Sequence, residues 1–395
     1  MKKQIIWTTE TLGDIDPKLS TGGTPRRDNP EFWKKCNIPW VKVSDTHEKI
    51  IHKTEESINE KALLESNAKK FPKGSVIMSI IGTIGNVSLL GIDAAISQSV
   101  IGINPDKKKI LSEYLVYYID FQKNQINDES QKGTHKNMNT PMVKNIKIRY
   151  PPLPIQQKIV NVLNQITLLK EKRKQSLEWG RQLLLSSFLT FFGEPAINSQ
   201  KWDSCIIKDV MQKKLQNGLY KHDKFYGKGT KIAWVENISD SSNELIVNDL
   251  KMVQLDQNEM KFLLNKNDVL ITRSSHLGKR GVGVMNVFDN HEDVCFESHI
   301  MRLVLNLTEI NPYYLCTYFK TRFARENLYV KHGNMASIDQ PEIEKILILL
   351  PPIKLQNDFA KIAIKIQDML TKQIFSEETL KRLELSVYDE FFITS

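Results

Sequence analysis

Cysteine is scarce in this sequence, and its placement excludes the two roles that clustered cysteines usually have. The 395 residues include four cysteines, at positions 36, 205, 295 and 316, and no two of them form a CxxC pair. No histidine cluster lies beside them, and the eight histidines show no metal-ligand spacing. We therefore expect free thiols in a reducing compartment, with neither a disulfide framework nor a metal site.

Long apolar runs are also missing. The least charged stretch, residues 76–92, is interrupted by glycine and polar residues at 79, 82, 83, 85, 86 and 88. This pattern predicts a strand–turn–strand unit and not a membrane-spanning helix. The polar N-terminal segment MKKQIIWTTETLGD does not fit a secretory signal peptide. We expect a cytoplasmic protein.

Signatures of catalysis are missing as well. The sequence contains neither the GxxxxGK[ST] phosphate-binding motif nor a glycine-rich loop for S-adenosylmethionine. GKRGVG at 278–283 lies between predicted strands, without the strand–loop–helix context of a nucleotide site. INPYY at 310–314 has one proline where the adenine-methyltransferase motif has two, and an Asn cap followed by Pro312 explains it. We predict a non-catalytic chain that binds no cofactor itself.

The composition is that of a folded protein with a moderate basic excess. Hydrophobic residues make up 41% of the chain and charged residues 26%, and the length predicts two or three domains. Lys and Arg number 55 against 46 Asp and Glu, which gives a net charge of +9. This excess permits a polyanionic partner without establishing one.

An internal duplication organises the chain. Segments 151–195 and 351–395 both begin with Pro-Pro and share residues at a constant offset of 200. The first has no proline from Ile155 to Phe192, which predicts a helix of about 57 Å that needs an equally long partner. The shared residues are Pro152/Pro352, Gln156/Gln356, Ile166/Ile366, Lys172/Lys372, Ser176/Ser376, Glu178/Glu378, Leu183/Leu383, Leu185/Leu385, Ser186/Ser386, Phe191/Phe391 and Phe192/Phe392.

Both segments also carry a heptad pattern, in which apolar residues alternate at spacings of four and three. This spacing is typical of a coiled-coil seam, and it turns polar at the same place in each segment, residues 173–176 and 373–376. We predict that the two helices pair as an antiparallel coiled coil. The seam residues proposed for pairing and subunit docking are Ile159, Ile166, Leu169, Leu183, Phe359, Ile366, Met369 and Leu383.

The segments before each long helix repeat one plan in diverged form. IPWVKVSDT at 38–46 matches IAWVENISD at 232–240, with Trp40 against Trp234, and both tryptophans are expected in the core. The predicted fold class is α+β, with two tandem globular α/β domains, each followed by a long helix, in a pseudo-two-fold repeat. The predicted segments are domain 1 at 1–150, helix 1 at 151–195, domain 2 at 196–350 and helix 2 at 351–395.

Two similar heads on a rigid rod suit duplex DNA, because base-reading heads must land at a set helical separation. Two diverged heads would read two different half-sites. A coiled-coil scaffold with protein-binding heads is the alternative, and only the DNA-binding chain should lose affinity steeply with salt.

The order of the motifs resembles that of the specificity subunits of type I restriction–modification systems. The resemblance rests on GGTP at 22–25, IPWVKVSD, SIIGTIGNV, GTHKNMN, and PPLPIQQKI and PPIKLQNDF at the helix starts. Two departures are Ile155 and Leu355, where the family usually has Glu, and LQNGLYKHDKFYG in domain 2, where GGTP has no counterpart.

The resemblance implies a division of labour between this chain and its partners. Each domain would read one half of a bipartite, asymmetric DNA site, and the helices would set the spacer. Two methyltransferase subunits and the restriction subunits would dock on this core. S-adenosylmethionine, ATP and Mg would then be bound by those partner subunits.

Direct readout of DNA needs Arg, Lys, Asn, Gln or Ser side chains on loops that enter the major groove, and phosphate contacts need Lys, Arg and small hydroxyls around them. In domain 1 the candidates are Thr24, Arg26, Arg27, Lys42, Ser44, Asn86, Gln98, Lys132, His135, Lys136 and Asn137. In domain 2 they are Lys221, His222, Lys224, Tyr226, Lys228, Asn237, Arg273, Ser274, His276, Lys279, Arg280, His299, Lys331, His332 and Asn334.

Overall fold

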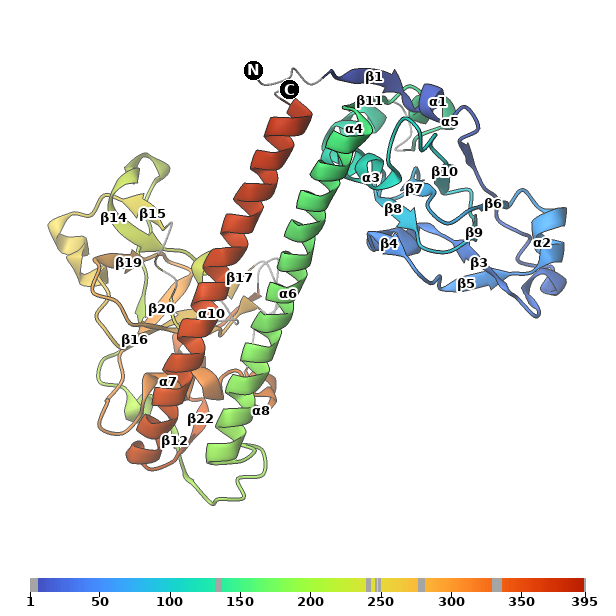
Figure 1. Ribbon diagram of the computed structural model, residues 1–395. Helices are drawn as coiled ribbons and strands as arrows, with labels where there is room; N and C mark the ends of the chain where they lie inside the picture. Colours follow the sequence, from blue (N-terminus) through green and yellow to red (C-terminus); the bar gives the residue numbers. More distant parts are fainter. Residues whose placement is uncertain are drawn as a thin grey trace. The chain divides into compact units, whose positions relative to one another are not determined.

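The chain divides into two compact units (Figure 1). The computed structural model describes residues 6–131, 137–238, 243–245, 247, 250–275, 281–328 and 336–393. One unit comprises residues 1–169 and 380–395, and the other comprises residues 170–379. Each unit therefore contains one globular domain together with parts of both long helices. The segment boundaries given by the sequence remain a prediction.

The two long helices form where the duplication predicts them. Helix α6 (Leu153–Phe192) has 40 residues, and α10 (Ile353–Tyr388) has 36 and continues into a π-helical turn, Asp389–Ile393. Each begins directly after a Pro-Pro pair, because proline is tolerated before and at the first turn of a helix but not inside it.

The first unit holds two main sheets. One has the strand order β2-β10-β7-β8-β4 and the other β5-β3-β9-β6, while β1 pairs with β11. The strands are β1 (Thr8–Thr11), β2 (Ser20–Thr21), β3 (Ile38–Val41), β4 (Ile50–Ile51), β5 (Glu56–Ile58), β6 (Lys69–Phe71), β7 (Val76–Ser79), β8 (Val87–Leu90), β9 (Ala94–Ile96), β10 (Val100–Ile103) and β11 (Lys147–Tyr150). The helices are α1 (Leu12–Ile15), α2 (Glu60–Glu65), α3 (Ser112–Phe121), α4 (Lys123–Gln131) and α5 (Thr140–Lys144).

The second unit repeats this arrangement. Its described sheets have the orders β13-β20-β16-β18 and β15-β14-β19, with the pairs β12-β22 and β17-β21. The strands are β12 (Asp203–Ile206), β13 (Gln216–Asn217), β14 (Tyr226–Ala233), β15 (Lys251–Val253), β16 (Asp268–Thr272), β17 (Ser274–Ser275), β18 (Met285–Phe288), β19 (Val294–Phe296), β20 (Ile300–Leu303), β21 (Ala336–Ser337) and β22 (Leu347–Leu350). The helices are α7 (Pro312–Tyr318), α8 (Arg322–Glu326) and α9 (Gln340–Glu344).

A buried glutamine ties each long helix to the domain before it. Gln156 Oε1 accepts the backbone N–H of Leu111 at 2.8 Å, and its Nε2 donates to the carbonyls of Lys109 at 3.0 Å and Pro151 at 2.7 Å. Gln356 makes the same three bonds in the second unit. Its partners are Asn311, Glu309 and Pro351.

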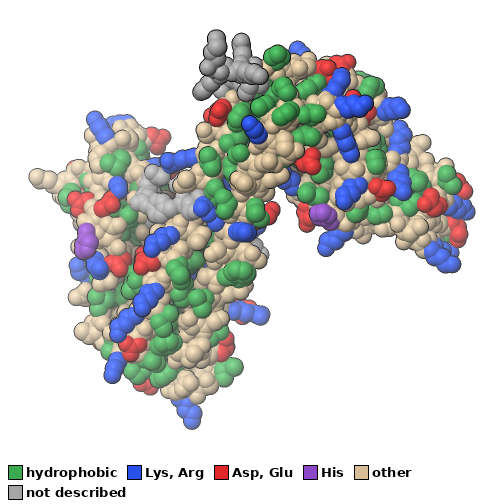
Figure 2. All heavy atoms as spheres, viewed as in Figure 1, with side chains coloured by type: hydrophobic (Ala, Val, Ile, Leu, Met, Phe, Trp, Pro, Cys, Tyr) green, Lys and Arg blue, Asp and Glu red, His purple; other side chains and the backbone are tan. Residues whose placement is uncertain are grey.

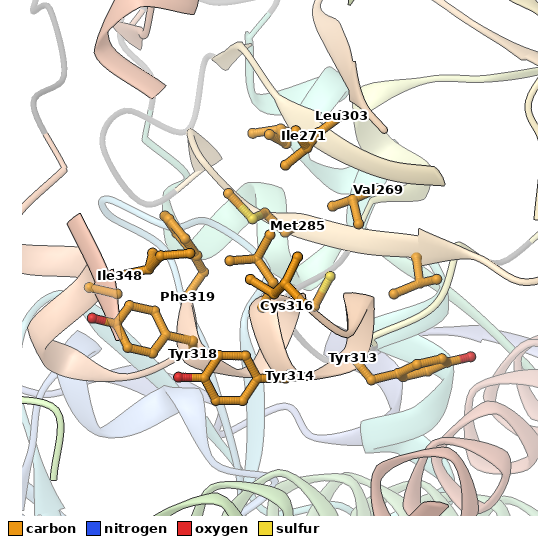
Figure 3. Close-up of a cluster of buried hydrophobic side chains, with 14 of the residues drawn as sticks. Val269, Ile271, Met285, Leu303, Tyr313, Tyr314, Cys316, Tyr318, Phe319 and Ile348 are labelled. Carbon is orange, nitrogen blue, oxygen red and sulfur yellow. The ribbon is translucent and has the colours of Figure 1, made fainter. Parts of the chain in front are cut away.

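Aromatic residues close each domain core against the far end of the other long helix. In the first unit the ring of Phe392 lies 5.6 Å from that of Tyr114, and in the second unit Phe192 lies 4.8 Å from Tyr314. Figure 3 shows Tyr314 with other side chains of α7 in the core of the second unit, which also contains Val269, Met285, Leu303 and Ile348. These aromatic pairs are related by the same offset of 200 as the sequence repeat.

Within the second unit, α6 and α10 run antiparallel, as predicted. The ring of Phe188 lies 5.6 Å from that of Phe359, and a Cβ added to Gly180 would lie 2.5 Å from the Leu370 side chain. Moving along α6 from 180 to 188 therefore means moving back along α10 from 370 to 359. Gly180 is required here by the close approach of the two helices.

The residues of the predicted heptad seam differ in burial. Ile159, Ile166, Phe359 and Ile366 are buried, as are Leu380 and Val387, which continue the same spacing along α10. Leu169, Leu183, Met369 and Leu383 are 44–53% exposed, and the neighbouring Leu184 and Leu370 are buried instead. A straight helix with 3.6 residues per turn drifts by about 20° per heptad, so packing on the domain selects adjacent positions.

The sequence-based match of Trp40 with Trp234 is wrong by two residues. In the β-ladders Trp40 lies opposite Ala95, and Ile232 lies opposite Cys295. Ala95 and Cys295 are equivalent residues of the repeat, because they are separated by the offset of 200. Trp40 is therefore equivalent to Ile232. Trp40 is the buried core residue expected, with 2% of its surface exposed, whereas Trp234 is only half buried.

Among the described helices, none is long and apolar enough to cross a membrane.

Candidate nucleic-acid interface

In domain 1, several loops meet around the turn between β9 and β10, residues 97–99. The loop that carries GGTP reaches it through the bond from Gly23 N–H to the carbonyl of Ile96, at 3.1 Å. The end of β3 reaches it through the bond from Ser97 N–H to Val41, at 2.9 Å. The end of β7 reaches it through the bond from Ile80 N–H to Ser99, at 3.0 Å.

The same bonds recur in domain 2 around residues 297–299. The backbone N–H of Leu219 donates to the carbonyl of Phe296 at 2.8 Å, that of Glu297 to Ala233 at 3.0 Å, and that of Arg273 to His299 at 2.7 Å. A further segment joins each cluster, because Met138 N–H donates to Ile80, and Ile338 N–H donates to Arg273, both at 2.9 Å. We call the loops that meet at 97–99 and at 297–299 the loop edge of each domain.

One glycine in each domain permits this close approach. A Cβ at Gly22 would lie 1.8 Å from the carbonyl oxygen of Ile96, and one at Gly218 would lie 2.1 Å from that of Glu297. Gly218, within LQNGLYK, therefore takes the place of Gly22 in domain 2. The counterpart of GGTP that sequence comparison missed is this single glycine.

Most of the described candidates of domain 1 lie on the loop edge. Thr24, Arg26, Gln98 and Asn137 are exposed there. Asn86 is half buried, and its amide donates to Thr83 at 3.2 Å.

Three candidates of domain 1 are already paired with carboxylates. Arg27 bonds to Glu56 at 2.5 Å and lies over the ring of Trp33, and Lys42 bonds to Glu56 at 2.6 Å. The hydrogen bond from Arg27 lowers the pKa of Glu56, and the hydrogen bond to Glu56 raises the pKa of Lys42. Ser44 is exposed and donates to Glu55 at 3.0 Å. Sequence reasoning missed both glutamates.

The candidates of domain 2 fall into exposed and engaged groups. His222, Lys224, Lys228 and His299 are exposed, Arg273 is half buried and Ser274 is buried in β17. Lys221 pairs with Glu259, Asn237 caps the backbone N–H of Trp234 at 2.8 Å, and the ring of Tyr226 lies 5.5 Å from that of Trp234. Burial raises the pKa of Tyr226.

Nine candidates lie outside the described residues: Lys132, His135, Lys136, His276, Lys279, Arg280, Lys331, His332 and Asn334. Two described strands lie next to six of them in the sequence, β17 before His276 and β21 after Asn334. These two strands pair with each other, with Ser275 opposite Ala336.

A pocket of about 240 Å³ opens on the loop edge of domain 2. Its walls include Tyr220, which is 76% exposed, and Trp234, over whose ring the Lys251 ammonium lies at 4.6 Å. Its floor includes Glu297, a buried carboxylate that sequence reasoning did not single out. Its position could have drawn attention to it, because Glu297 lies 200 residues after Ser97, the first residue of the turn at 97–99 (Ser-Gln-Ser) in domain 1.

A second, more apolar groove lies between the long helices within the second unit. Its volume is about 340 Å³, and its rim carries Trp179, Leu183 and Met369, which are 61%, 51% and 53% exposed. Hydrophobic side chains are visible among Lys and Arg on the face of this unit in Figure 2.

Comparison with known proteins places the chain in a family. Residues 5–179 and 199–384 match the type I restriction modification DNA specificity domain, so the chain belongs to this family and contains two such domains. The resemblance to type I specificity subunits is thereby confirmed. Among the described residues there is no group of three or more Asp, Glu, His or Cys that could hold a metal ion.

Its relatives include full-length and partial matches. The type I restriction enzyme MjaIX specificity subunit of Methanocaldococcus jannaschii is 25% identical over 96% of this chain and 90% of its own length. The EcoR124I/EcoR124II specificity subunit of Escherichia coli is 28% identical over 46% of this chain, which spans about half (48%) of that relative. The S subunit of M. genitalium has the same fold, with a TM-score of 0.61 at 13% identity over 98% of this chain and 96% of its own.

Proposed function

We propose that this chain is the DNA-reading subunit of a type I restriction–modification complex, and that each loop edge reads one half of a bipartite, asymmetric site. The observation that carries the proposal is the contrast between a repeated frame and diverged loops. The same backbone bonds assemble both loop edges, yet the side chains that they present differ: Ser97, Gln98 and Ser99 in domain 1, and Glu297, Ser298 and His299 in domain 2.

The long helices would set the unread spacer between the half-sites. Support comes from the continuity of α6, which runs for 40 residues through parts of both units. Support also comes from the buried Gln156 and Gln356, which fix the start of each helix on its own domain. A base-reading head must land at a set helical separation, and a helix held at both ends can provide it.

The exposed apolar residues of the helices would dock the methyltransferase subunits. Trp179, Leu183 and Met369 surround a groove, and large exposed aromatic and Met side chains are enriched in protein interfaces. Two methyltransferase subunits on this chain, joined by restriction subunits, would supply the chemistry together with S-adenosylmethionine, ATP and Mg. One solved structural neighbour is described in terms of complex assembly of the type I R-M system, and it matches with a TM-score of 0.51.

A methylome tests this proposal directly. The chain is expressed with its methyltransferase subunit in a host that lacks adenine methylation, and modified adenines are mapped by long-read sequencing. We expect one split motif, methylated once on each strand. A stable complex that adds no methylation and shows no salt-dependent DNA affinity would instead favour the protein scaffold. For a DNA binder, the logarithm of affinity should fall with the logarithm of salt by about 0.9 per neutralised phosphate.

A further inference from the structure

The centre of the loop edge in domain 2 is a buried carboxylate that holds an exposed imidazole. Glu297 is 4% exposed, and its Oε2 accepts the backbone N–H of His299 at 2.9 Å and lies 2.8 Å from the ring Nδ1. The His299 side chain is 47% exposed. Within the part of the chain that the structure describes, its other ring nitrogen, Nε2, has no hydrogen-bond partner.

The equivalent turn of domain 1 has the same arrangement with smaller groups. Ser97 is 2% exposed, and its hydroxyl lies 2.9 Å from that of Ser99. In both domains the first residue of the turn is buried and holds the side chain of the third. The carbonyl of the third residue also accepts the backbone N–H of the residue that follows the neighbouring strand, Ile80 after β7 or Arg273 after β16.

This geometry points to His299 as a specificity-determining residue that contacts one base of the half-site read by domain 2. Glu297 is its positioning residue. In domain 1, Ser99 and Ser97 have the same two roles. The inference rests on the proposed DNA-reading function and deepens it, because it names the contact and the class of base.

The carboxylate selects which ring nitrogen of His299 carries the proton. A carboxylate oxygen only accepts hydrogen bonds, so Nδ1 is the donor and the Nε2 of the neutral ring is an acceptor. In the major groove the bases that offer a donor are adenine, through its N6 amino group, and cytosine, through its N4 amino group. With its ring neutral, His299 should therefore select a base that has an exocyclic amino group at its position.

The surroundings of His299 suit contact with a base. It lines the pocket together with the aromatic rings of Tyr220, His222 and Trp234. Glu297 lies at the floor of this pocket, away from solvent, so its interaction with Nδ1 is stronger than it would be in water. A ring held in one orientation loses less freedom on binding than a mobile one, which strengthens its contact with the base that fits that orientation.

The test compares methylomes of the full chain with its methyltransferase subunits, as wild type and as His299→Ala, Glu297→Ala, Glu297→Gln and Ser99→Ala. We expect His299→Ala to relax one position in one half-site, with the other half-site unchanged. Glu297→Ala should relax the same position, whereas Glu297→Gln should retain the preference, because its amide oxygen can still accept from Nδ1–H. Ser99→Ala should relax a position in the other half-site.

Binding measurements provide a readout that a purely structural role would not move. A duplex in which the base concerned lacks its exocyclic amino group should bind the wild-type complex roughly two- to tenfold more weakly, as for loss of one hydrogen bond. His299→Ala should bind both duplexes equally. His291→Ala is the matched control, since His291 is also an exposed histidine but lies in the β18–β19 connection, and it should leave the motif unchanged.

The outcomes separate this inference from the proposed function. If wild type reads a split motif and His299→Ala, folded as judged by its melting temperature, retains every position, the inference is overturned and the DNA-reading function stands. Relaxation of the same half-site by Ser99→Ala and His299→Ala would also overturn it. If the wild-type complex itself neither methylates nor prefers any sequence, the proposed function fails.

Discussion

Lengthening both long helices by four residues between the units should lengthen the unread spacer by about two base pairs. Helix α6 passes from one unit to the other between residues 169 and 170, and α10 does so between 379 and 380. Each helical residue adds about 1.5 Å, so four add about 6 Å, while base pairs are spaced by about 3.4 Å. Four residues also turn a helix by about 400°, so its faces are displaced by only about 40°.

Both insertions are needed because both helices pass from one unit to the other. An insertion in α6 alone would leave α10 four residues short, and the mismatch would strain the contacts that hold the helices on each domain, such as Phe392 against Tyr114 and Phe188 against Phe359. The assay is the methylome, in which the motif reports both half-sites and the spacer. A matched control inserts the same four residues in the exposed loop between Lys107 and Lys108 and should leave the motif unchanged. Full methylation by the doubly lengthened chain with an unchanged spacer would refute the idea that the helices act as a ruler.

Three further predictions follow from individual contacts. Gln156→Ala should lower the free energy of unfolding by about 1–3 kcal/mol in a denaturation experiment, because it removes the side-chain partner of one buried and two part-buried backbone groups. The exposed Gln157→Ala should change the free energy of unfolding by under about 0.5 kcal/mol. Trp179→Ala should abolish co-purification with the methyltransferase subunit without lowering the melting temperature. The control Leu64→Ala, which removes an 81% exposed side chain from domain 1, should leave co-purification intact. Co-purification retained by Trp179→Ala would show that the groove is not the docking site. Glu56→Gln should release Arg27, while Lys42 keeps its ion pair with Glu55 at 3.1 Å. The salt dependence of non-specific DNA binding should then steepen by about 0.9 for the released cation, with the exposed Glu60→Gln as control. An unchanged slope would mean that Arg27 does not reach a phosphate. Since the folded-state pKa of Glu56 is lowered, its ion pairs persist above the ordinary carboxyl pKa and are lost as the pH falls through the lowered value, so acid should mimic Glu56→Gln.

The framework of the fold could be predicted because its repeated contacts use repeated residues. Gln156 and Gln356, Tyr114 and Tyr314, and Phe192 and Phe392 make equivalent contacts, and each pair is separated by 200 residues. A constant offset can be read from the sequence without knowing what the contacts are. The presence of two long helices could be predicted for the same reason.

Pairings that depend on local geometry could not be predicted in this way. The match of Trp40 with Trp234 was based on residue identity. In the β-ladders, however, the residue of domain 2 that occupies the position of Trp40 is Ile232. At two places along the helices the buried residue is the one after the predicted position, Leu184 after Leu183 and Leu370 after Met369, because the helices pack on their domains as well as on each other. Among the candidate DNA contacts, the cations were identifiable by type, but their carboxylate partners Glu55, Glu56 and Glu259 had no signal of their own.

The division between repeated and diverged residues explains how one frame can serve two different half-sites. The bonds that assemble each loop edge run between backbone atoms, so they place almost no constraint on the side chains presented there. A strict requirement shared by both domains is a glycine, at Gly22 and Gly218, where a Cβ would collide with a carbonyl oxygen. The residues at 99 and 299 can then differ as much as serine and histidine, provided that the buried neighbour at 97 or 297 changes with them to keep its hydrogen bond. We therefore expect that exchanging the turn as a unit, SQS for ESH, alters one half-site cleanly, whereas exchanging the third residue alone weakens recognition.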